Sequence, residues 1–553
     1  MKPAASAKKW IGQIARPYVG RILSLSLISG ISAGSTVVFA LLSQQVIDTA
    51  IGGGNFWWPG ILLVSVLAVR VLLSVWYVYL SNWVSGKMEI SIKDRMFTAL
   101  FRKQWQDVNG FHSGELLNRM TADTNVVVNG LVGIVPHVVS MVVSLIACLT
   151  VLFTVDWKFT VVLLGVGLLM LACAGFYGKQ MKVLHKQVQT ADGAGKSFIQ
   201  EVLANWMMVQ SFEGFGNVNR RMNGLLKDHF KKRMRRTVWS NIAHGAMYLL
   251  FNGSYYVALL WGAFQLAAGA LSYGALTALL QIVSQIRAPF MNMSGILPQY
   301  YNMMASAERI LELEQLPDEP RLPQLYGAEE LYDRLHTIEV SDVSFAYDEE
   351  KIVLSDADFT LRKGEFVALA GFSGIGKTTL FKLLLGFYPP DSGTLTAHLD
   401  EEEKLPLGAD TRCLFAYVPQ QSMLLSGTIR ENIAFCCESV TDEAIWAAAE
   451  VADVAEAIRQ QPEGLDTVLG ERGAGLSEGQ LQRLAIARAV LSEAPILLLD
   501  ECTASLDEAT EERVLQRLRA LPDRTCLCIS HRPAALEICD RVVRVEDGKF
   551  VEE

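Results

Sequence analysis

Gly371-Phe372-Ser373-Gly374-Ile375-Gly376-Lys377-Thr378-Thr379 (GFSGIGKTT) is the stretch that decides the fold of the second half of this chain. It fits the pattern G-x-x-x-x-G-K-[ST] in the setting that the pattern requires. The apolar run FVALA (366–370) before it is typical of a strand, and LFKLLLGF (380–387) after it is typical of a helix. Glycines let successive backbone N–H groups turn towards a phosphate, and the new helix adds its positive N-terminal end. The stretch therefore predicts a phosphate-binding loop in an α/β domain.

Individual residues of this loop are expected to bind the phosphates or Mg²⁺. Lys377 is expected to reach the β- and γ-phosphate oxygens of a nucleoside triphosphate, and the Thr378 hydroxyl to ligate Mg²⁺. The other loop residues that we expect to contact the nucleotide are Ser373, Gly374, Gly376 and Thr379.

A second pattern lies downstream, where the apolar run Ile496–Asp500 (ILLLD) is followed by Glu501. It is typical of a buried strand that ends in two carboxylates. Asp500 is expected to hold the Mg²⁺ shell, and Glu501 to polarise the attacking water as a general base. Two adjacent acids at a strand end can also be a surface pair that caps a helix, but the phosphate loop upstream argues against that reading. Together the two patterns predict hydrolysis of a nucleoside triphosphate.

The composition of the whole chain divides it into two unlike halves. Of 553 residues, 51% are hydrophobic and 19% are charged, against roughly 25% charged in an average soluble protein. Residues 1–310 contain 27 Lys and Arg against 12 Asp and Glu, and residues 311–553 contain 22 against 46. A disordered chain and a disulfide-stapled secreted domain are excluded. A dedicated nucleic-acid binder is excluded too, because an acidic soluble half repels phosphate backbones.

The first half contains long runs without charge, and about 20 apolar residues cross the ~30 Å hydrocarbon layer of a membrane. The fifty residues Thr237–Ile286 contain no Asp, Glu, Lys or Arg. Fifty is too many for one crossing and enough for two, and the small residues of Ala267–Gly274 (AAGALSYG) favour a turn. The sequence therefore predicts six transmembrane helices, which we expect to continue beyond the apolar runs. The other four expected spans are Ile22–Ile47, Trp57–Val84 (with Arg70 inside it), Thr124–Val155 (with His137) and Phe159–Gly178.

The positive charges give an orientation. Lys and Arg gather before the first span, between spans two and three, and in 179–236, whereas the short loops near 48–56 and 266–272 contain none. Because positive loops stay in the cytoplasm, both termini and the nucleotide-binding half are expected there. We expect an integral protein of the bacterial cytoplasmic (inner) membrane.

The domains follow from these two halves. We expect an all-α six-helix transmembrane domain over 1–315, a linker over 316–335 that contains prolines, and an α/β P-loop NTPase domain over 336–553.

Seven of the nine cysteines follow residue 311, and none has CxxC or Cys/His ligand spacing. We therefore expect reduced, buried cytosolic thiols and no cysteine metal site.

Leu476–Gln480 (LSEGQ), followed by the helical LQRLAIARAVL, lies about twenty residues before the Asp500–Glu501 pair. At this point the chain resembles the ATP-binding cassette family, whose signature is usually LSGGQ. The resemblance implies that Ser477, Gly479 and Gln480 bind the nucleotide. Glu478 replaces the usual second glycine, and whether it weakens this half-site stays open.

Further matches occur in the order that the family shows. Tyr347 (FAY) resembles the aromatic that stacks on adenine, and Gln420 (YVPQQ) resembles the glutamine that links nucleotide to membrane domain and ligates Mg²⁺. Ala504–Asp507 is similar to the D-loop, and His531 (CISHR) to the switch histidine that contacts the γ-phosphate. The catalytic residues implied by the loop patterns and the resemblance together are Glu501, His531, Gln420 and Lys377.

The membrane half extends the resemblance. Six spans before one nucleotide-binding domain resemble the exporter-type half-transporters of drugs, lipids and peptides. Thr467–Gly473 (TVLGERG), Phe111–Thr124 (first coupling loop) and Ala305–Ile310 (ASAERI) resemble stretches of that subgroup. The resemblance implies a dimer, with a second copy or a sister chain, in which the signature serine of one protomer completes the ATP site of the other. Two ATP close the nucleotide domains and switch the access of the helices, with Mg²⁺ as the only other cofactor.

Alternatives to ATP-driven export remain. A soluble cassette protein acting on nucleic acid is excluded by the six spans, but an importer built on the exporter fold and, less favoured, an ATP-gated conduction pathway stay open. No sequence motif identifies the transported solute.

Arg70 and Arg287 lie near the middle of their spans, where placing an arginine costs about 2.5–3.5 kcal/mol. Either they face a wet cavity or an interface, or they help to bind an anionic or amphipathic cargo.

Overall fold

The computed structural model describes residues 3–321, 327–347, 352–372, 374–400, 403–421, 423–437, 439–470 and 475–552. The side chains of 3–5, 162–163, 166–176, 178–179, 182, 244, 247, 251, 287–294 and 297 lie outside this description. The chain divides into two compact units. The first consists of Met1–Thr98 and Ser113–Gln315, and the second of Ala99–His112 and Leu316–Glu553.

Within the described residues, all regular elements of the first unit are helices, as expected for charge-free segments that must satisfy their own backbone hydrogen bonds in lipid. Each predicted span lies inside one long helix, and the helices extend beyond the apolar runs as predicted. The long helices are α2 (Val19–Ile51), α3 (Trp57–Leu100), α6 (Thr124–Val155), α7 (Trp157–Ala204), α9 (Phe215–Ala267) and α10 (Tyr273–Glu314). The short elements are α1 (Pro3–Ala15), η1 (Arg16–Tyr18), α5 (Ser113–Asn118), the π-helical turn η2 (Arg119–Asp123) and α8 (Trp206–Ser211).

The break predicted within Ala267–Gly274 is confirmed. Helix α9 ends at Ala267, and α10 begins at Tyr273 with Ser272 as its N-cap. Among the described residues, three helical stretches are long and apolar enough to cross a membrane: Ser6–Ile51, Trp57–Leu100 and Ser113–Val155. A shorter apolar helix covers Tyr273–Ile286. The total of six spans stays a prediction.

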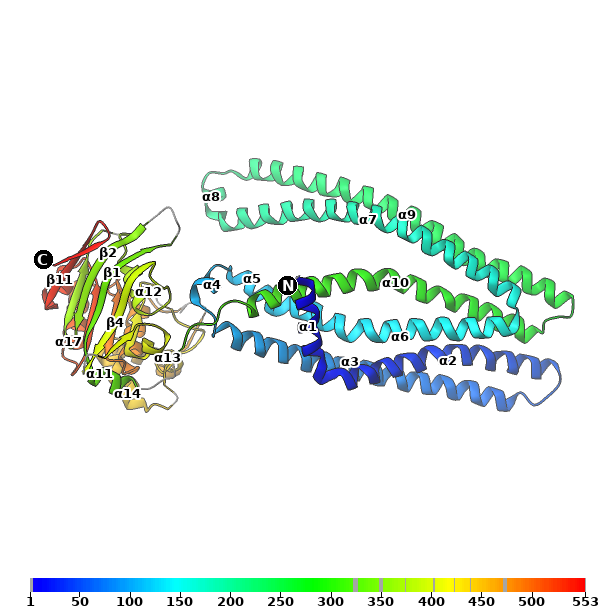
Figure 1. Ribbon diagram of the computed structural model, residues 1–553, viewed down its shortest axis with the longest axis horizontal. Helices are drawn as coiled ribbons and strands as arrows, with labels where there is room; N and C mark the ends of the chain where they lie inside the picture. Colours follow the sequence, from blue (N-terminus) through cyan, green and yellow to red (C-terminus); the bar gives the residue numbers. More distant parts are fainter. Residues whose placement is uncertain are drawn as a thin grey trace. The chain divides into compact units, whose positions relative to one another are not determined.

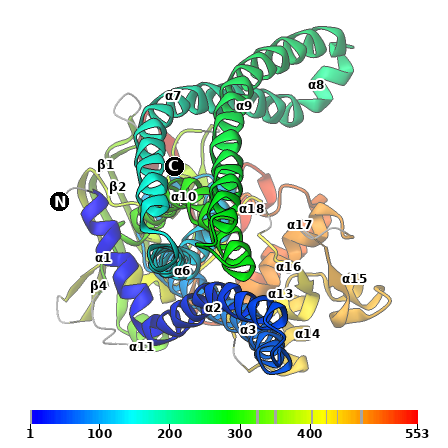
Figure 2. The same ribbon diagram turned by 90° about the vertical axis from the view of Figure 1, so that its right-hand side faces the viewer.

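Helices α2, α6 and α10 pack against one another, and α7 packs along α9 with α8 between them at the tip of this hairpin (Figures 1 and 2). Polar contacts tie both ends of the bundle. Near the turn between α9 and α10, Asp48 accepts hydrogen bonds from the Ser272 hydroxyl (2.8 Å) and the Gly274 amide (2.9 Å). At the other end of α10, the Arg309 guanidinium pairs with buried Asp123 of η2. These contacts fix the register of α10 against α2 and η2.

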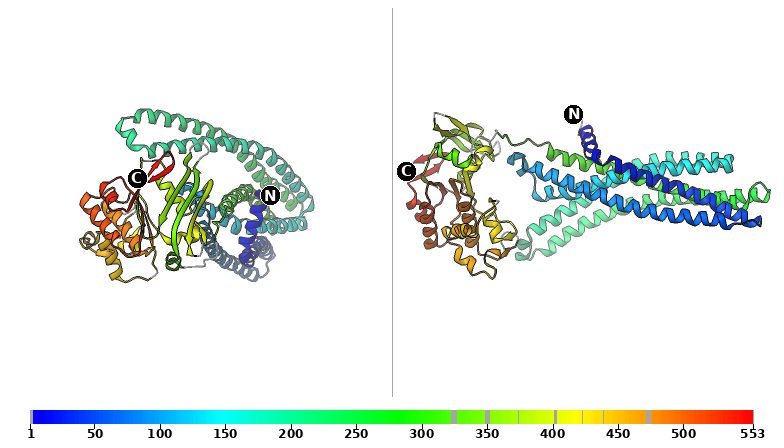
Figure 3. Two further views of the ribbon diagram at one scale, coloured as in Figure 1. Left: turned by 60° about the vertical axis from the view of Figure 1, so that its left-hand side comes forward. Right: turned by 90° about the horizontal axis from the view of Figure 1, so that it is seen from below.

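The second unit contains two main sheets and the helices around them (Figure 3). The antiparallel sheet has the order β2-β1-β4-β5, the larger sheet β12-β11-β3-β10-β9-β6, and β7-β8 form a small ribbon. The strands are β1 (Leu335–Ala346), β2 (Ile352–Arg362), β3 (Phe366–Ala370), β4 (Ser392–Leu399), β5 (Lys404–Pro406), β6 (Phe415–Val418), β7 (Gly427–Thr428), β8 (Val468–Leu469), β9 (Ile496–Asp500), β10 (Thr525–Ile529), β11 (Arg541–Glu546) and β12 (Lys549–Glu552). The helices are α4 (Trp105–Asn109), α11 (Ala328–Asp333), α12 (Lys377–Leu384), α13 (Ile429–Ile433), α14 (Asp442–Val451), α15 (Ala455–Arg459), α16 (Glu478–Leu491), α17 (Glu508–Arg519) and α18 (Pro533–Ile538), with 3-10 turns η4 (Ala409–Leu414) and η5 (Gly464–Asp466).

The register of the larger sheet positions the candidate site. Strands β11, β3, β10, β9 and β6 run parallel to one another, and the edge strand β12 pairs antiparallel with β11. Carboxyl ends of parallel strands meet at one edge, where ligands bind in open α/β sheets. The predicted class, a helical membrane domain followed by an α/β nucleotide-binding domain, is confirmed.

The cysteines follow the expectation of buried thiols only in part. Cys502, Cys526 and Cys528 are buried in the core of the second unit. Burial raises the pKa of the Cys502 thiol to about 12. Cys436, however, is exposed. The expectation is wrong there because the residue lies in the turn that follows α13 instead of in a regular element.

Candidate ATP-binding site

Four strands of the larger sheet deliver the candidate residues to one edge. The phosphate loop follows β3, Asp500 ends β9 with Glu501 after it, His531 comes two residues after β10, and Gln420 two residues after β6. The strands are buried and apolar, so their registers are fixed by the core and the residues beyond their carboxyl ends converge. The structure therefore brings together side chains that are far apart in the sequence.

The phosphate loop depends on glycine at two close approaches. Gly376, the N-cap of α12, has φ +118°, and Gly371 has φ +139°. A Cβ on Gly371 would lie 2.9 Å from the Val545 carbonyl oxygen, so no larger residue fits there. Gly374 also has positive φ, and Ser373 lies outside the described residues. The result is a cradle of backbone beside the N-terminus of α12, a site suited to an anion.

Lys377 lies inside this cradle and is only 5% exposed. Its ammonium donates to the carbonyl oxygens of Gly371 and Phe372, and it lies 3.1 Å from the Nε2 of His531. Burial lowers the pKa of Lys377, although the charges of Glu501 and Asp500 act in the opposite direction. A buried cation whose described hydrogen bonds include two backbone carbonyl oxygens has capacity for phosphate oxygens.

Asp500 and Thr378 supply adjacent oxygen atoms. The Thr378 hydroxyl donates to Asp500 Oδ1 at 3.1 Å, and the Tyr417 hydroxyl donates to Oδ2 at 3.1 Å. Asp500 is 3% exposed, and burial raises its pKa. A carboxylate and a hydroxyl side by side fit Mg²⁺, which prefers oxygen ligands and binds proteins through few of them. Tyr417 was missed in the sequence, where one tyrosine in a strand gives no signal of a site.

Glu501 is held in an unusual backbone conformation. Its φ is +47°, a left-handed value that is uncommon for a residue with a long side chain. Its amide donates to the Ile529 carbonyl (3.1 Å), which ties the residue to β10. Its carboxylate accepts a hydrogen bond from Gln420 Nε2 (2.8 Å) and lies 3.8 Å from His531 Nε2. Gln420, Glu501 and His531 therefore form one polar group.

The signature segment caps helix α16. The Ser477 side chain accepts from the Gln480 amide, and the Gln480 side chain accepts from the Ser477 amide at 2.9 Å. A Cβ on Gly479 would lie 3.2 Å from the Ser505 carbonyl oxygen, so glycine permits close packing against Ala504–Asp507. Among the described residues, no hydrogen bond joins Ser477 or Gln480 to the phosphate loop. Glu478 is exposed in the first turn of α16.

Tyr347 lies beside the phosphate loop with 43% of its surface exposed. Its hydroxyl is 3.1 Å from the Thr379 hydroxyl and accepts from Lys382 Nζ at 3.3 Å. A partly exposed aromatic ring fixed next to a phosphate cradle can stack on a nucleotide base.

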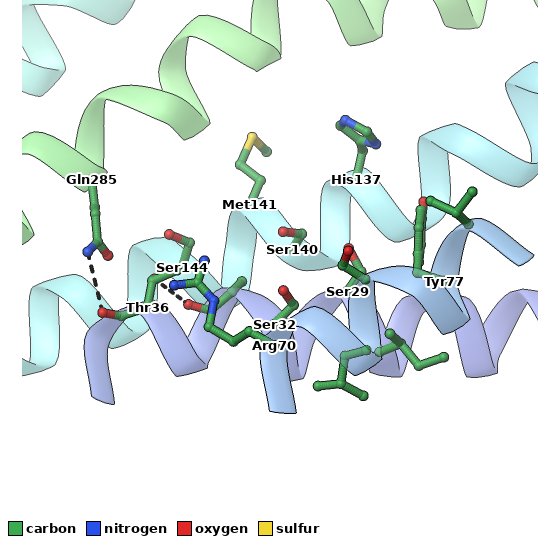
Figure 4. Close-up of a pocket in the computed structure, with 15 residues that line it drawn as sticks. Ser29, Ser32, Thr36, Arg70, Tyr77, His137, Ser140, Met141, Ser144 and Gln285 are labelled. Carbon is green, nitrogen blue, oxygen red and sulfur yellow. Dashed lines mark hydrogen bonds between the residues drawn. The ribbon is translucent and has the colours of Figure 1, made fainter. Parts of the chain in front are cut away.

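The first unit contains a second candidate site, a cavity of about 440 Å³ between α2, α3, α6 and α10. Arg70 of α3 and His137 of α6 line it with hydroxyl-bearing side chains, and no carboxylate occurs among the described lining residues. Figure 4 shows the polar lining residues, with Gln285 bonded to the Thr36 carbonyl (3.3 Å). The Gln285 side-chain oxygen is buried without a partner among the described residues. The hydroxyl-bearing residues are Ser29, Ser32, Thr36, Ser74, Tyr77, Ser140 and Ser144.

Arg70 therefore faces a polar cavity. The Arg287 side chain lies outside the described side chains. The sequence indicated Arg70, but it missed the serines, because a serine in an apolar helix can bond its own backbone and gives no signal of a cavity.

Comparisons with known proteins agree with both units. The model of the ABC transporter transmembrane region matches residues 23–290, and the ABC transporter model matches 354–504. The ATP-dependent lipid A-core flippase of Vibrio cholerae serotype O1 is 29% identical over 545 residues, 97% of this chain and 92% of the relative. ABC transporter B family member 1 of Dictyostelium discoideum is 30% identical over 491 residues, 88% of this chain and 53% of the relative.

The fold has a solved counterpart. A bacterial Atm1-family ABC exporter with ATP bound superposes with a TM-score of 0.79 at 22% identity, over 96% of this chain and 94% of that one. The membrane domain, the nucleotide-binding domain and their order all agree. The chain therefore belongs to the ABC transporter family, as an ATP-hydrolysing half-transporter with an integral membrane domain.

Proposed function

We propose that this half-transporter exports a small or amphipathic solute of the drug, lipid or peptide class by alternating access, after it has dimerised. The observation that carries the proposal is the convergence of Lys377, Asp500, Glu501 and His531 at one sheet edge. The same chain has a polar cavity among the long apolar helices of its first unit, where a solute could bind. The proposed domains are 1–315, 316–335 and 336–553.

The proposed chemistry follows from the contacts at the sheet edge. Lys377 and the glycine cradle bind the triphosphate, and Tyr347 stacks on adenine. Thr378, Asp500 and Gln420 would hold Mg²⁺, which supplies positive charge against the developing charge of the phosphates. Glu501 accepts the proton of the attacking water. His531 lies 3.1 Å from the Lys377 ammonium, so its imidazole can donate to the same phosphate group.

A second copy of the chain is the partner that we propose. The signature residues Ser477, Gly479 and Gln480 make no hydrogen bond to this chain's own phosphate loop within the described residues, as expected if they serve the site of another protomer. Each unit also exposes several large apolar side chains that are near one another in the sequence, an arrangement that fits a contact surface. In the first unit they are Trp206, Met207, Met208, Phe212 and Phe215, and in the second they are Met423, Leu425 and Phe435.

The location that we propose is the bacterial inner membrane, with both termini and the ATP site in the cytoplasm. The support is the distribution of Lys and Arg and the bacterial relatives, several of which are named lipid A-core flippases. Those names favour the lipid class among the three solute classes.

The direction of transport can be measured in inside-out vesicles with ATP added outside. Fluorescent probes of the drug, lipid and peptide classes are offered in turn, and Lys377→Ala vesicles serve as the control. ATP-dependent accumulation of a probe in the lumen is the expected result. ATP-dependent loss from preloaded vesicles would instead identify an importer, and passive equilibration that needs only ATP would identify conduction.

Replacing Arg70 and Arg287 tests whether these two arginines bind an anionic cargo. Methionine keeps the length of the side chain and removes its charge. If the arginines bind the cargo, the double variant Arg70→Met, Arg287→Met should need about tenfold more of an anionic lipid for half-maximal ATPase stimulation, because hydrogen bonds to charged groups contribute about 1.5–3 kcal/mol. Basal ATPase should persist.

The matched control for this prediction is Arg233→Met, which removes a charge from the basic block of α9 outside the cavity lining. Its stimulation curve should match that of the wild type. Unchanged stimulation in the double variant would leave Arg70 as a residue that merely faces water.

A further inference from the structure

The segment Ala99–His112 belongs to the second unit although its first two residues are the last two of α3. Backbone contacts attach it to the residues that follow α10. The Gln104 amide donates to the Pro317 carbonyl (3.1 Å), and the Glu319 amide donates to the Arg102 carbonyl (2.7 Å). Lys103 forms a β-bridge with Asp318 and a salt bridge with its carboxylate (2.6 Å). The segment is thus fixed to the nucleotide-binding unit by several contacts.

Two side chains of this segment contact adjacent aromatic residues after α12. The Trp105 ring lies 5.4 Å, centroid to centroid, from the Phe387 ring. The Arg412 guanidinium also lies over Phe387, at 4.9 Å. Asn109 Nδ2 donates to the Tyr388 hydroxyl at 3.4 Å. The segment therefore contacts both members of the Phe387–Tyr388 pair.

Tyr388 also contacts Tyr347 at the candidate ATP site. Its ring is 8% exposed and meets the Tyr347 ring edge-on, with centroids 5.3 Å apart. Phe345 completes a three-ring cluster, 5.6 Å from Tyr388 and 5.0 Å from Tyr347. Tyr347 is partly exposed, and its hydroxyl and Lys382 contacts fix one end of the residue, so these two edge-to-face contacts support the plane of its ring. An aromatic ring can stack on a base only in a suitable orientation.

We propose that Tyr388 is the positioning residue for Tyr347, and that Asn109 and Trp105 act on Tyr347 through the Phe387–Tyr388 pair. The inference rests on the proposed stacking of Tyr347 on adenine. It assigns to Ala99–His112 control over the affinity for adenine nucleotides. Because such coupling is reciprocal, a bound base also biases the segment that continues from α3.

The test uses the full-length transporter in lipid nanodiscs and compares Tyr388→Leu with Tyr388→Phe. Leucine removes the ring that faces Tyr347, whereas phenylalanine keeps it. Tyr388→Leu should raise the KM for ATP about threefold to tenfold, the range that aromatic pair energies imply, with kcat within twofold. Tyr388→Phe should restore most of the affinity. Inhibition by inorganic tripolyphosphate, which has no base, should not change.

Two further comparisons separate positioning from a general loss of structure. In a Tyr347→Ala background, Tyr388→Leu should have no additional effect on KM. Phe359→Leu is the matched control, because Phe359 is a buried ring in the same core that packs at a tilt on Phe550 and, among the described ring contacts, has none with Tyr347. It should lower the melting temperature and leave KM unchanged.

Asn109→Leu tests the contribution of the segment itself and does not disturb the core. It should raise KM about twofold, and it should add nothing to Tyr388→Phe, which lacks the same hydrogen bond. Additive effects of these two substitutions would overturn the role of the segment.

Failure of the proposed adenine stacking can be distinguished from failure of the positioning role of Tyr388. If Tyr347→Ala leaves KM unchanged, the proposed stacking is wrong and this inference falls with it. If Tyr347→Ala raises KM but Tyr388→Leu does not, the stacking stands and the inference alone is wrong. Equal weakening of ATP and tripolyphosphate by Tyr388→Leu would also overturn it.

Discussion

Glu501→Gln is expected to lower the rate of ATP hydrolysis by about 10²-fold or more, the contribution typical of a general base, while ATP binding remains. Glutamine keeps the shape of the side chain and the possibility of a hydrogen bond to Gln420, but it cannot accept the proton of water. The left-handed backbone of Glu501 is unaffected, so the substitution changes the chemistry alone. Steady-state hydrolysis and equilibrium binding of a fluorescent ATP analogue measure the two properties separately.

The matched control is Glu508→Gln, the same chemical change on an exposed residue in the first turn of α17. It should hydrolyse ATP at close to the wild-type rate. Glu501→Gln should also accumulate a nucleotide-bound closed dimer, measured as the nucleotide that stays with the dimer through size-exclusion chromatography in detergent. Wild-type turnover in Glu501→Gln would mean that another group accepts the proton.

Local sequence patterns predicted the elements of the ATP site because each of them is short and continuous. The runs FVALA and ILLLD are β3 and β9 with the expected bounds, since buried parallel strands are continuously apolar. The break between α9 and α10 was readable because a stretch rich in small residues interrupts two apolar runs.

Contacts between distant parts of the chain could not be predicted in the same way. Asn109 and Tyr388 are 279 positions apart, and the grouping of Ala99–His112 with the nucleotide-binding unit depends on tertiary packing. The same holds for Tyr417, whose hydroxyl bond to Asp500 follows from the pairing of β6 with β9. The hydrogen bond from Gln420 to Glu501 depends on the same packing, and the contact of Gln420 with the metal that the resemblance implied stays a prediction.

The cavity of the first unit illustrates a further limit. Arg70 was conspicuous because charge is costly inside a span. Ser29 and Ser140 were not, because their hydroxyls are compatible with an apolar helix, and only the packing of α2 against α6 brings them to one cavity.

Ser477→Ala and Lys377→Ala are each expected to reduce hydrolysis about 10²-fold or more, because each removes a preorganised group aimed at the phosphates. The two variants should differ in their affinity for ATP. Lys377→Ala loses affinity for ATP at its own phosphate loop. Ser477→Ala keeps that affinity, since Ser477 caps α16 and makes no hydrogen bond to its own loop among the described residues. Thr441→Ala, which removes the equivalent cap of α14, controls for the lost cap and should stay active.

Mixing the two inactive chains then tests whether the ATP site is shared between protomers. In a dimer of one Lys377→Ala chain and one Ser477→Ala chain, one composite site has lost both groups and the other has kept both. Co-expressed chains with different affinity tags, purified through both tags, should therefore hydrolyse ATP well above either parental dimer, up to about half of the wild-type rate if the sites work independently. Were each site built from a single chain, both sites of the mixed dimer would carry one defect, and its activity would stay at the parental level.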